Sequence, residues 1–225
     1  MSDRALEICC DSLGSARAAA DGGADRIELC ADLAADGVTP EVDDLRAAVE
    51  VVPTFVLVRC RPGDFTFTGT EIDTMCDDIR RMCEAGAAGI VSGALLESGE
   101  IDVEATRRLL GAARGTPFTF HKAFDLCPDQ ESAMRQLVGL GIDRVLTSGG
   151  QRYAVDAIDR LARLAEIGGG TTRVLCGGGV RAENLARLVE VPAVDEFHSA
   201  ARPSVDRPVS LGDVRAMRRI LDGAR

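Results

Sequence analysis

The feature that most constrains this chain is a regular alternation of short apolar runs with longer segments of helical periodicity, repeated eight times along the sequence. Short runs rich in Val, Ile, Leu and Phe are typical of buried strands, and the longer segments place apolar residues on one helical stripe. Eight strand–helix units in 225 residues predict an α/β fold, a closed parallel (β/α)₈ barrel of the TIM type with residues 1–225 as its single domain. An open, doubly wound sheet is the alternative, but eight similar units favour closure.

The expected elements follow from this alternation. Strands are expected at residues 6–10, 26–30, 55–59, 89–92, 118–121, 144–147, 173–176 and 194–198. Helices are expected at residues 13–20, 42–51, 71–85, 103–113, 130–140, 154–167, 182–189 and 211–221. Glycine near helix ends, as at Gly23 and Gly141, supplies the left-handed residue that terminates a helix.

Composition limits the classes of function. The hydrophobic share is 46%, enough for a large core, and the formal net charge is −10. Binding to nucleic acids or anionic membranes needs clustered Lys and Arg, so this acidity argues against both as partners. The residues before the first strand show no signal peptide, and no apolar run is long enough to span a bilayer. We therefore expect a cytoplasmic protein in which the eight cysteines stay reduced.

The first two strands carry the same polar pattern. Glu7 and Cys9 alternate with apolar residues on the first strand, as Glu28 and Cys30 do on the second. Successive side chains point to opposite faces of a strand, and neighbouring strands lie about 4.8 Å apart. The apolar residues should therefore face the helices, and the Glu and Cys side chains should share the barrel lumen.

The same alternation places Leu57, Arg59 and Arg61 of the third strand inside the barrel. A buried carboxylate is costly unless it is paired, so Arg59 is expected to pair with Glu7 or Glu28. One interpretation is a structural Glu–Arg network that fills the barrel. The other is a ligand site at its mouth.

Cys9 and Cys30 are the candidate metal ligands. Thiolates are soft ligands that select Cu(I), and neighbouring strands could bring the two sulfurs together. The alternative is that both are buried free cysteines that act as small apolar residues. Zinc is less favoured, because His121 and His198 are the only histidines and neither lies at ligand spacing from a cysteine.

A run of three glycines ends the seventh expected strand, just before a helix. Glycine lets backbone N–H groups approach an anion, and the loops after strands seven and eight form the usual phosphate site of this fold. The alternative is a tight turn that needs glycine without any ligand. The residues expected to form an anion site are Ser148, Gly149, Gly177, Gly178, Gly179, His198 and Ser199.

Further candidates lie at other strand ends, where the active sites of this fold form. Lys122, the only lysine, could form a Schiff base, but it could equally bind an anion or pair with Asp125. These patterns identify no catalytic residue. The candidates are Glu7, Glu28, Arg59, His121, Lys122 and Asp125.

Together, these segments resemble the CutC family, which is named for copper homeostasis. The matching segments follow the family order along almost the whole chain, at residues 7–9, 22–30, 37–40, 59–65, 120–125, 144–149, 177–180 and 196–199. The resemblance implies a cytoplasmic barrel that forms homo-oligomers, as a dimer or tetramer, and takes part in copper handling. Cys9 and Cys30 stand where the family has its candidate copper-binding cysteines.

The chain departs from the family pattern at two positions. Lys122 stands where the family typically has Arg, which weakens a Schiff-base mechanism, and Cys60 stands where it typically has Pro, which argues against Cys60 as a general ligand. Two functions remain open. The first is a copper-homeostasis protein that binds Cu(I) through Cys9 and Cys30. The second is an enzyme or sensor for a small anionic or phosphorylated metabolite at the C-terminal face of the barrel.

Overall fold

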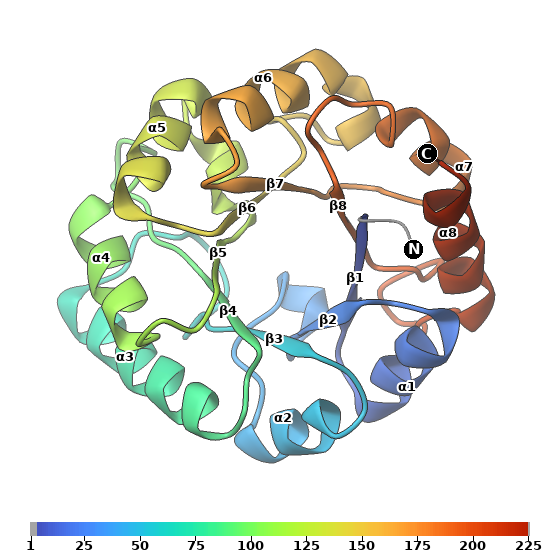
Figure 1. Cartoon of the computed structure of the whole chain (residues 1–225). Helices are drawn as coiled ribbons and strands as arrows, with labels where there is room; N and C mark the ends of the chain where they lie inside the picture. Colours follow the sequence, from blue (N-terminus) through green and yellow to red (C-terminus); the bar gives the residue numbers. More distant parts are fainter. Residues whose placement is uncertain (1–3, 225) are drawn as a thin grey trace.

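Eight parallel strands close into a barrel in which β1 is hydrogen-bonded to both β2 and β8. The structure is a computed structural model that describes residues 4–224, over which strand and helix alternate from end to end. Figure 1 looks along the barrel axis and shows the strands as an inner ring surrounded by the helices. The predicted (β/α)₈ barrel is confirmed.

The observed elements follow the predicted order. The strands are β1 (Ala5–Cys10), β2 (Arg26–Leu29), β3 (Thr54–Leu57), β4 (Gly89–Ser92), β5 (Phe118–Phe120), β6 (Arg144–Thr147), β7 (Arg173–Cys176) and β8 (Glu196–Ser199). The α-helices are α1 (Leu13–Gly22), α2 (Val42–Val49), α3 (Gly69–Glu84), α4 (Val103–Ala112), α5 (Gln130–Leu140), α6 (Ile158–Gly168), α7 (Ala182–Leu188) and α8 (Leu211–Gly223). Short 3₁₀ helices occur at η1 (Leu33–Ala35), η2 (Lys122–Leu126) and η3 (Ala154–Asp156).

The element ends differ from the predicted ones where loops supply other hydrogen bonds. β2 and β3 end before their predicted last residues, and beyond β2 the backbone of Ala31 pairs with Val38 instead. The helix predicted at 154–167 begins only at Ile158. Its first residues form η3, because the N–H of Ala154 donates to the carbonyl of Gly178 at 2.9 Å and Ala157 leaves the helical conformation.

Two separate apolar clusters stabilise the barrel. The larger lies between the strands and the helices and includes Leu6 and Ile8 of β1. The smaller lies on the opposite face of the strands, in the lumen, in agreement with the predicted alternation. Its buried members are Cys9, Cys30, Phe55, Leu57 and Val91.

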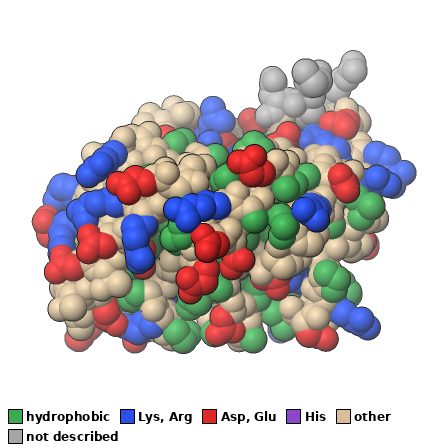
Figure 2. All heavy atoms as spheres, turned by 90° about the horizontal axis from the view of Figure 1, so that it is seen from below, with side chains coloured by type: hydrophobic (Ala, Val, Ile, Leu, Met, Phe, Trp, Pro, Cys, Tyr) green, Lys and Arg blue, Asp and Glu red, His purple; other side chains and the backbone are tan. Residues whose placement is uncertain are grey.

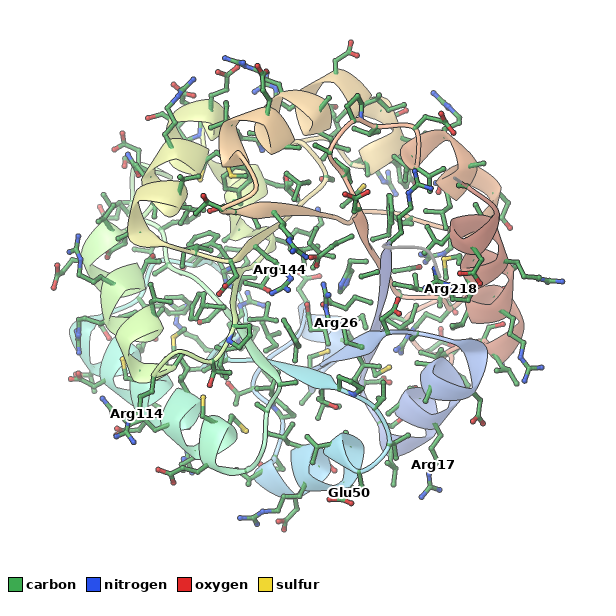
Figure 3. All side chains as sticks on the ribbon, in the orientation of Figure 1. Arg17, Arg26, Glu50, Arg114, Arg144 and Arg218 are labelled. Atoms are coloured by element: carbon green, nitrogen blue, oxygen red, sulfur yellow. The ribbon has the colours of Figure 1, made fainter. Side chains whose placement is uncertain are left out.

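Buried ion pairs fill the N-terminal end of the lumen. Arg26 pairs with Glu7 and with Glu196, each at 2.5 Å, and Glu196 also accepts from Nε of Arg144 at 2.7 Å. Figure 3 shows Arg26 and Arg144 at the centre of the ring of strands. Buried charges are tolerated when they are paired in this way. The predicted Glu–Arg network therefore exists at this end, although it uses different arginines.

Arg59 takes no part in this network, so its predicted ion pair with Glu7 or Glu28 is wrong. Its guanidinium donates instead to the carbonyl oxygens of Gly37 at 2.9 Å and Gly63 at 2.6 Å. The physical reason is position: Arg59 lies beyond the end of β3, among the loops of the barrel mouth, where backbone carbonyls satisfy it.

The outer surface carries charges of both signs. On the face seen in Figure 2, Lys and Arg side chains lie interspersed with Asp and Glu side chains. Some form exposed pairs within one helix, such as Arg46 with Asp43. The prediction that Arg61 lies inside the barrel is wrong, because Arg61 lies beyond the end of β3, its side chain is 34% exposed and it pairs with Glu71 at 2.5 Å.

Over residues 4–224, no helix combines the length and apolar character needed to cross a membrane. Residues 1–3, on which the expectation of a missing signal peptide partly rests, lie outside the described residues.

Candidate ligand site at the barrel mouth

A cavity of about 350 Å³ opens at the C-terminal ends of the strands. Its lining includes Cys9, Glu28, Cys30, His121 and His198. The (β/α)₈ fold places its active sites at this end, and the volume lies within the range of small-molecule pockets.

The two predicted metal ligands meet in this cavity. The Sγ atoms of Cys9 and Cys30 lie 3.8 Å apart, because β1 and β2 are hydrogen-bonded neighbours. Both side chains are buried. The contact with Cys30, together with burial, raises the pKa of the Cys9 thiol well above its usual range. A metal ion that binds here must therefore displace a proton from Cys9.

His198 joins the cysteines from β8. Its Nδ1 lies 2.8 Å from Oε1 of Glu7 and 3.9 Å from Oε2 of Glu28, and ligand atoms of these three residues all lie within 4.8 Å of one another. Burial would lower the pKa of His198, but its contacts with Cys9 and Glu7 raise it well above the ordinary value. The two neighbouring glutamates therefore favour the protonated imidazole.

Those glutamates differ in pKa. Burial favours protonation of Glu7, but Arg26 and His198 lower its pKa to about 2. Burial raises the pKa of Glu28 to about 7, because it has no arginine partner and His198 offsets burial only in part. Within the described residues, Oε2 of Glu28 is buried without a hydrogen-bond partner. It is an unused acceptor in the cavity wall.

The contact of His198 with Cys9 was not predicted from the sequence, because these residues lie at opposite ends of the chain. The predicted closure of the barrel could have indicated this contact, since a closed barrel places the eighth strand beside the first. The register of these strands then pairs Glu7 with His198. The distance in sequence that counted against zinc therefore does not separate His198 from Cys9 in the folded chain.

An uncharged histidine lines the wall formed by β5. The ring of His121 packs edge-on against Phe65 and Phe120, with centroid distances of 4.7 and 5.6 Å. Burial, with the nearby Arg59, lowers the pKa of His121 to about 3. Neither ring nitrogen has a hydrogen-bond partner in the part of the chain that the structure describes.

The loop after β6 surrounds an internal carboxylate. Asp125 accepts hydrogen bonds from the hydroxyl of Thr147 and from the N–H and hydroxyl of Ser148 at 2.5–3.1 Å, and it pairs with Lys122 at 2.8 Å. The N–H of Gly149 donates to Oγ1 of Thr147 at 2.9 Å. Ser148 and Gly149, which we expected to bind an external anion, thus use these donors internally. Lys122 and Asp125 form the pair that the sequence analysis gave as an alternative.

The glycine loop after β7 reaches the cavity through Gly178 and Gly179 but not through Gly177. The φ angles of 109° and 66° at Gly178 and Gly179 favour glycine. A Cβ on Gly178 would lie 2.6 Å from Cβ of Ser148, and one on Gly179 would lie 2.5 Å from Cδ1 of Tyr153. Packing and conformation therefore explain the glycines without a ligand.

His198 and Ser199 also line the cavity, as predicted for the anion site. The hydroxyl of Ser199 donates to the carbonyl of Val180 at 2.6 Å and accepts from Arg181 at 3.2 Å. Of the seven residues expected to bind an anion, Gly178, Gly179, His198 and Ser199 thus share this wall.

The fold and the site define a class of protein, a closed parallel βα barrel with thiol, imidazole and carboxylate groups at its mouth. The model of the CutC family matches residues 4–203, and the chain belongs to this family. The resemblance in the sequence motifs is confirmed.

Named relatives agree with this assignment. The chain is 43% identical to the copper homeostasis protein cutC homolog of Homo sapiens over 203 residues, which cover 89% of this chain and 74% of that protein. It is 43% identical to the family protein CutC of Histophilus somni (strain 2336) over 199 residues, 88% of this chain and 82% of that protein. The solved structure of CutC from Streptococcus agalactiae matches with a TM-score of 0.83 at 31% identity, over 88% of this chain and 98% of that one.

The donor set at the mouth is compatible with Cu(I). Soft thiolates select this ion, and imidazole is also a copper ligand. Metal–thiolate bonds are about 2.3 Å for zinc, so two sulfurs 3.8 Å apart can share one ion of similar size. The cluster of Glu7, Glu28 and His198 offers harder donors, but Arg26 already occupies Glu7.

Proposed function

We propose that this protein binds Cu(I) at the barrel mouth through Cys9 and Cys30 and acts in copper homeostasis in the cytoplasm. The observation that carries the proposal is the 3.8 Å separation of two buried sulfurs in the mouth cavity. The name of the human relative supports a role in copper homeostasis. All eight cysteines are free thiols, the form expected in a reducing compartment.

His198 can supply a nitrogen ligand, since its side chain contacts Cys9, but the imidazole must first lose the proton that Glu7 and Glu28 favour. The Cys9 thiol is protonated at neutral pH, so Cu(I) displaces its proton and the apparent affinity rises with pH. The homo-oligomer, dimer or tetramer, stays a prediction.

Competition with a chromogenic Cu(I) chelator under anaerobic, reducing conditions tests the proposal. The wild type should take a single Cu(I) per chain from the chelator, and the double variant Cys9→Ser with Cys30→Ser should take none. The matched control is Cys60→Ser with Cys83→Ser, which removes two less buried thiols outside the mouth cavity and should bind as the wild type does.

Equal Cu(I) binding by the wild type and the Cys9/Cys30 double variant would refute this function. Circular dichroism must show that the double variant is folded, because both sulfurs are buried.

A second function, as an enzyme or sensor for a small anion, is favoured by a separate observation. Several buried polar atoms in the wall of the same cavity lack a hydrogen-bond partner among the described residues. They indicate that the ligand of this second function is polar.

A further inference from the structure

Several buried polar atoms without hydrogen-bond partners line the mouth cavity. Among the described residues these are Oε2 of Glu28, Nε of Arg59 and both ring nitrogens of His121, whereas others, such as Oγ1 of Thr106 and Nη1 of Arg144, lie elsewhere. Glu28, Arg59 and His121 all line the cavity. A buried polar atom without a partner is costly, and nearly all such atoms in native proteins are satisfied. Four such atoms in the wall of one cavity therefore indicate a polar ligand there.

The cavity also carries positive charge that no carboxylate neutralises directly. Arg181 donates to the hydroxyl of Ser199 and to backbone carbonyls, and Arg59 donates to backbone carbonyls alone. Within residues 4–224, neither guanidinium lies at ion-pair distance from Asp or Glu, and Asp36 and Asp64 act on Arg59 from farther away. In a chain of net charge −10, two such groups at one mouth favour an anionic ligand.

Lys122 differs from these two cations. Its ammonium pairs with Asp125 at 2.8 Å and donates to Ser148 at 3.1 Å, so its charge is compensated within the protein. The selectivity for an anion therefore rests on Arg59 and Arg181.

We propose that the mouth cavity binds a small hydroxylated organic anion, a hydroxy acid or a sugar phosphate. Its anionic group faces Arg59 and Arg181, a ligand hydroxyl donates to Oε2 of Glu28, and a second hydroxyl or a carbonyl group bonds with the imidazole of His121. Uncharged imidazole suits this role, because it has one donor and one acceptor nitrogen. A cavity of about 350 Å³ accommodates a ligand of this size.

This ligand site goes beyond copper binding, since it uses none of the cysteine sulfurs. It shares the cavity with Cys9 and Cys30, so the two functions need separate tests. The Cys9→Ser, Cys30→Ser double variant serves this purpose, because it should lose Cu(I) and still bind the organic anion.

Isothermal titration calorimetry on the full chain, with four probes, tests the inference. Glycerol phosphate and glycerate carry both an anionic group and hydroxyls, whereas glycerol lacks the charge and propionate lacks the hydroxyls. At least one of the first two should bind, and glycerol and propionate should bind about tenfold more weakly or not at all. Tighter binding of glycerol phosphate than of glycerate would indicate that the site prefers a phosphate group, and the reverse would indicate a carboxylate.

Variants then assign the binding to this cavity. Arg181→Met and His121→Phe should each weaken binding about tenfold or more. Arg187→Met is the matched control, because Arg187 lies on α7 close to Arg181 in the chain but does not line the cavity. If His121→Phe does not fold, Arg181→Met alone decides the question.

Two results would overturn the inference. One is the absence of binding heat for both hydroxylated anions with the wild type, in which case water satisfies the polar atoms. The other is unchanged binding in Arg181→Met, which would locate the anion elsewhere.

Discussion

At the scale of single residues, the available partners decide which buried charges are structural. Glu7 and Glu28 occupy equivalent positions in the repeated Glu-x-Cys pattern, yet only Glu7 pairs with an arginine in the described structure. Glu196 pairs with Arg26 and Arg144 and belongs with Glu7 to the network at the N-terminal end. Glu28, which has no arginine partner among the described residues, faces the cavity, so the same local motif gives one structural and one ligand-facing carboxylate.

Replacing Glu196 by Gln tests the structural role through its pH dependence. Burial raises the pKa of Glu196, but Arg26 and Arg144 lower it below its usual value of 4.5. A carboxyl group whose pKa is lower in the folded than in the unfolded state stabilises the fold at pH values above its pKa in the unfolded chain. This stabilisation is lost as the pH falls through its pKa in the folded protein. In urea unfolding, the free energy of unfolding of the wild type should therefore fall more between about pH 6 and about pH 3 than that of Glu196→Gln.

At neutral pH the variant should be less stable than the wild type by about 3–5 kcal/mol, since Arg26 and Arg144 lose a buried partner and the more exposed Arg173 also loses its ion pair. The control is Glu166→Gln in an exposed pair with Arg163, which should change stability by about 1 kcal/mol or less. If the free energy of unfolding had the same pH dependence in the wild type and in Glu196→Gln, the Glu196 carboxylate would not stabilise the fold.

At the scale of elements, hydrophobic periodicity predicted the order and type of all strands and α-helices because each buries one consistent face. It could not predict ends that depend on hydrogen bonds to distant loops, such as the late start of α6 at Ile158. Side-chain alternation on β1 and β2 predicted the shared position of Cys9 and Cys30. The contact of His198 with Glu7 depends on the β1–β8 register, which local periodicity does not contain.

The start of α3 offers a test of how local sequence sets an element. The N–H of Glu71 donates to Oγ1 of Thr68 at 3.3 Å, while the Glu71 carboxylate accepts from the Thr68 N–H at 2.7 Å. This reciprocal cap satisfies backbone donors that the helix leaves free. Thr68→Ala should lower the free energy of unfolding by about 1 kcal/mol in urea denaturation.

Thr70→Ala is the matched control for that cap. Thr70 is the exposed second residue of the same helix, and its side chain caps no backbone donor there. It should change stability by about 0.5 kcal/mol or less. Equal effects of the two substitutions would mean that the cap does not stabilise α3.

At the scale of the whole molecule, closure of the barrel assembles the site. Figure 1 shows β1 beside β8 and α1 beside α8, so the two ends of the chain meet. The contact between these helices is close, since a Cβ on Gly22 would lie 2.5 Å from Cγ1 of Val214. Cys9, Cys30 and His198 therefore come together only when the first, second and last strands are in register.

An anomalous-difference map at the copper absorption edge, from crystals of the Cu(I)-loaded protein, tests the copper site most directly. Our account predicts one peak within bonding distance of both Cys9 Sγ and Cys30 Sγ at the barrel mouth. A peak that contacts neither sulfur, or a barrel mouth without any peak in crystals shown by fluorescence to contain copper, would contradict it.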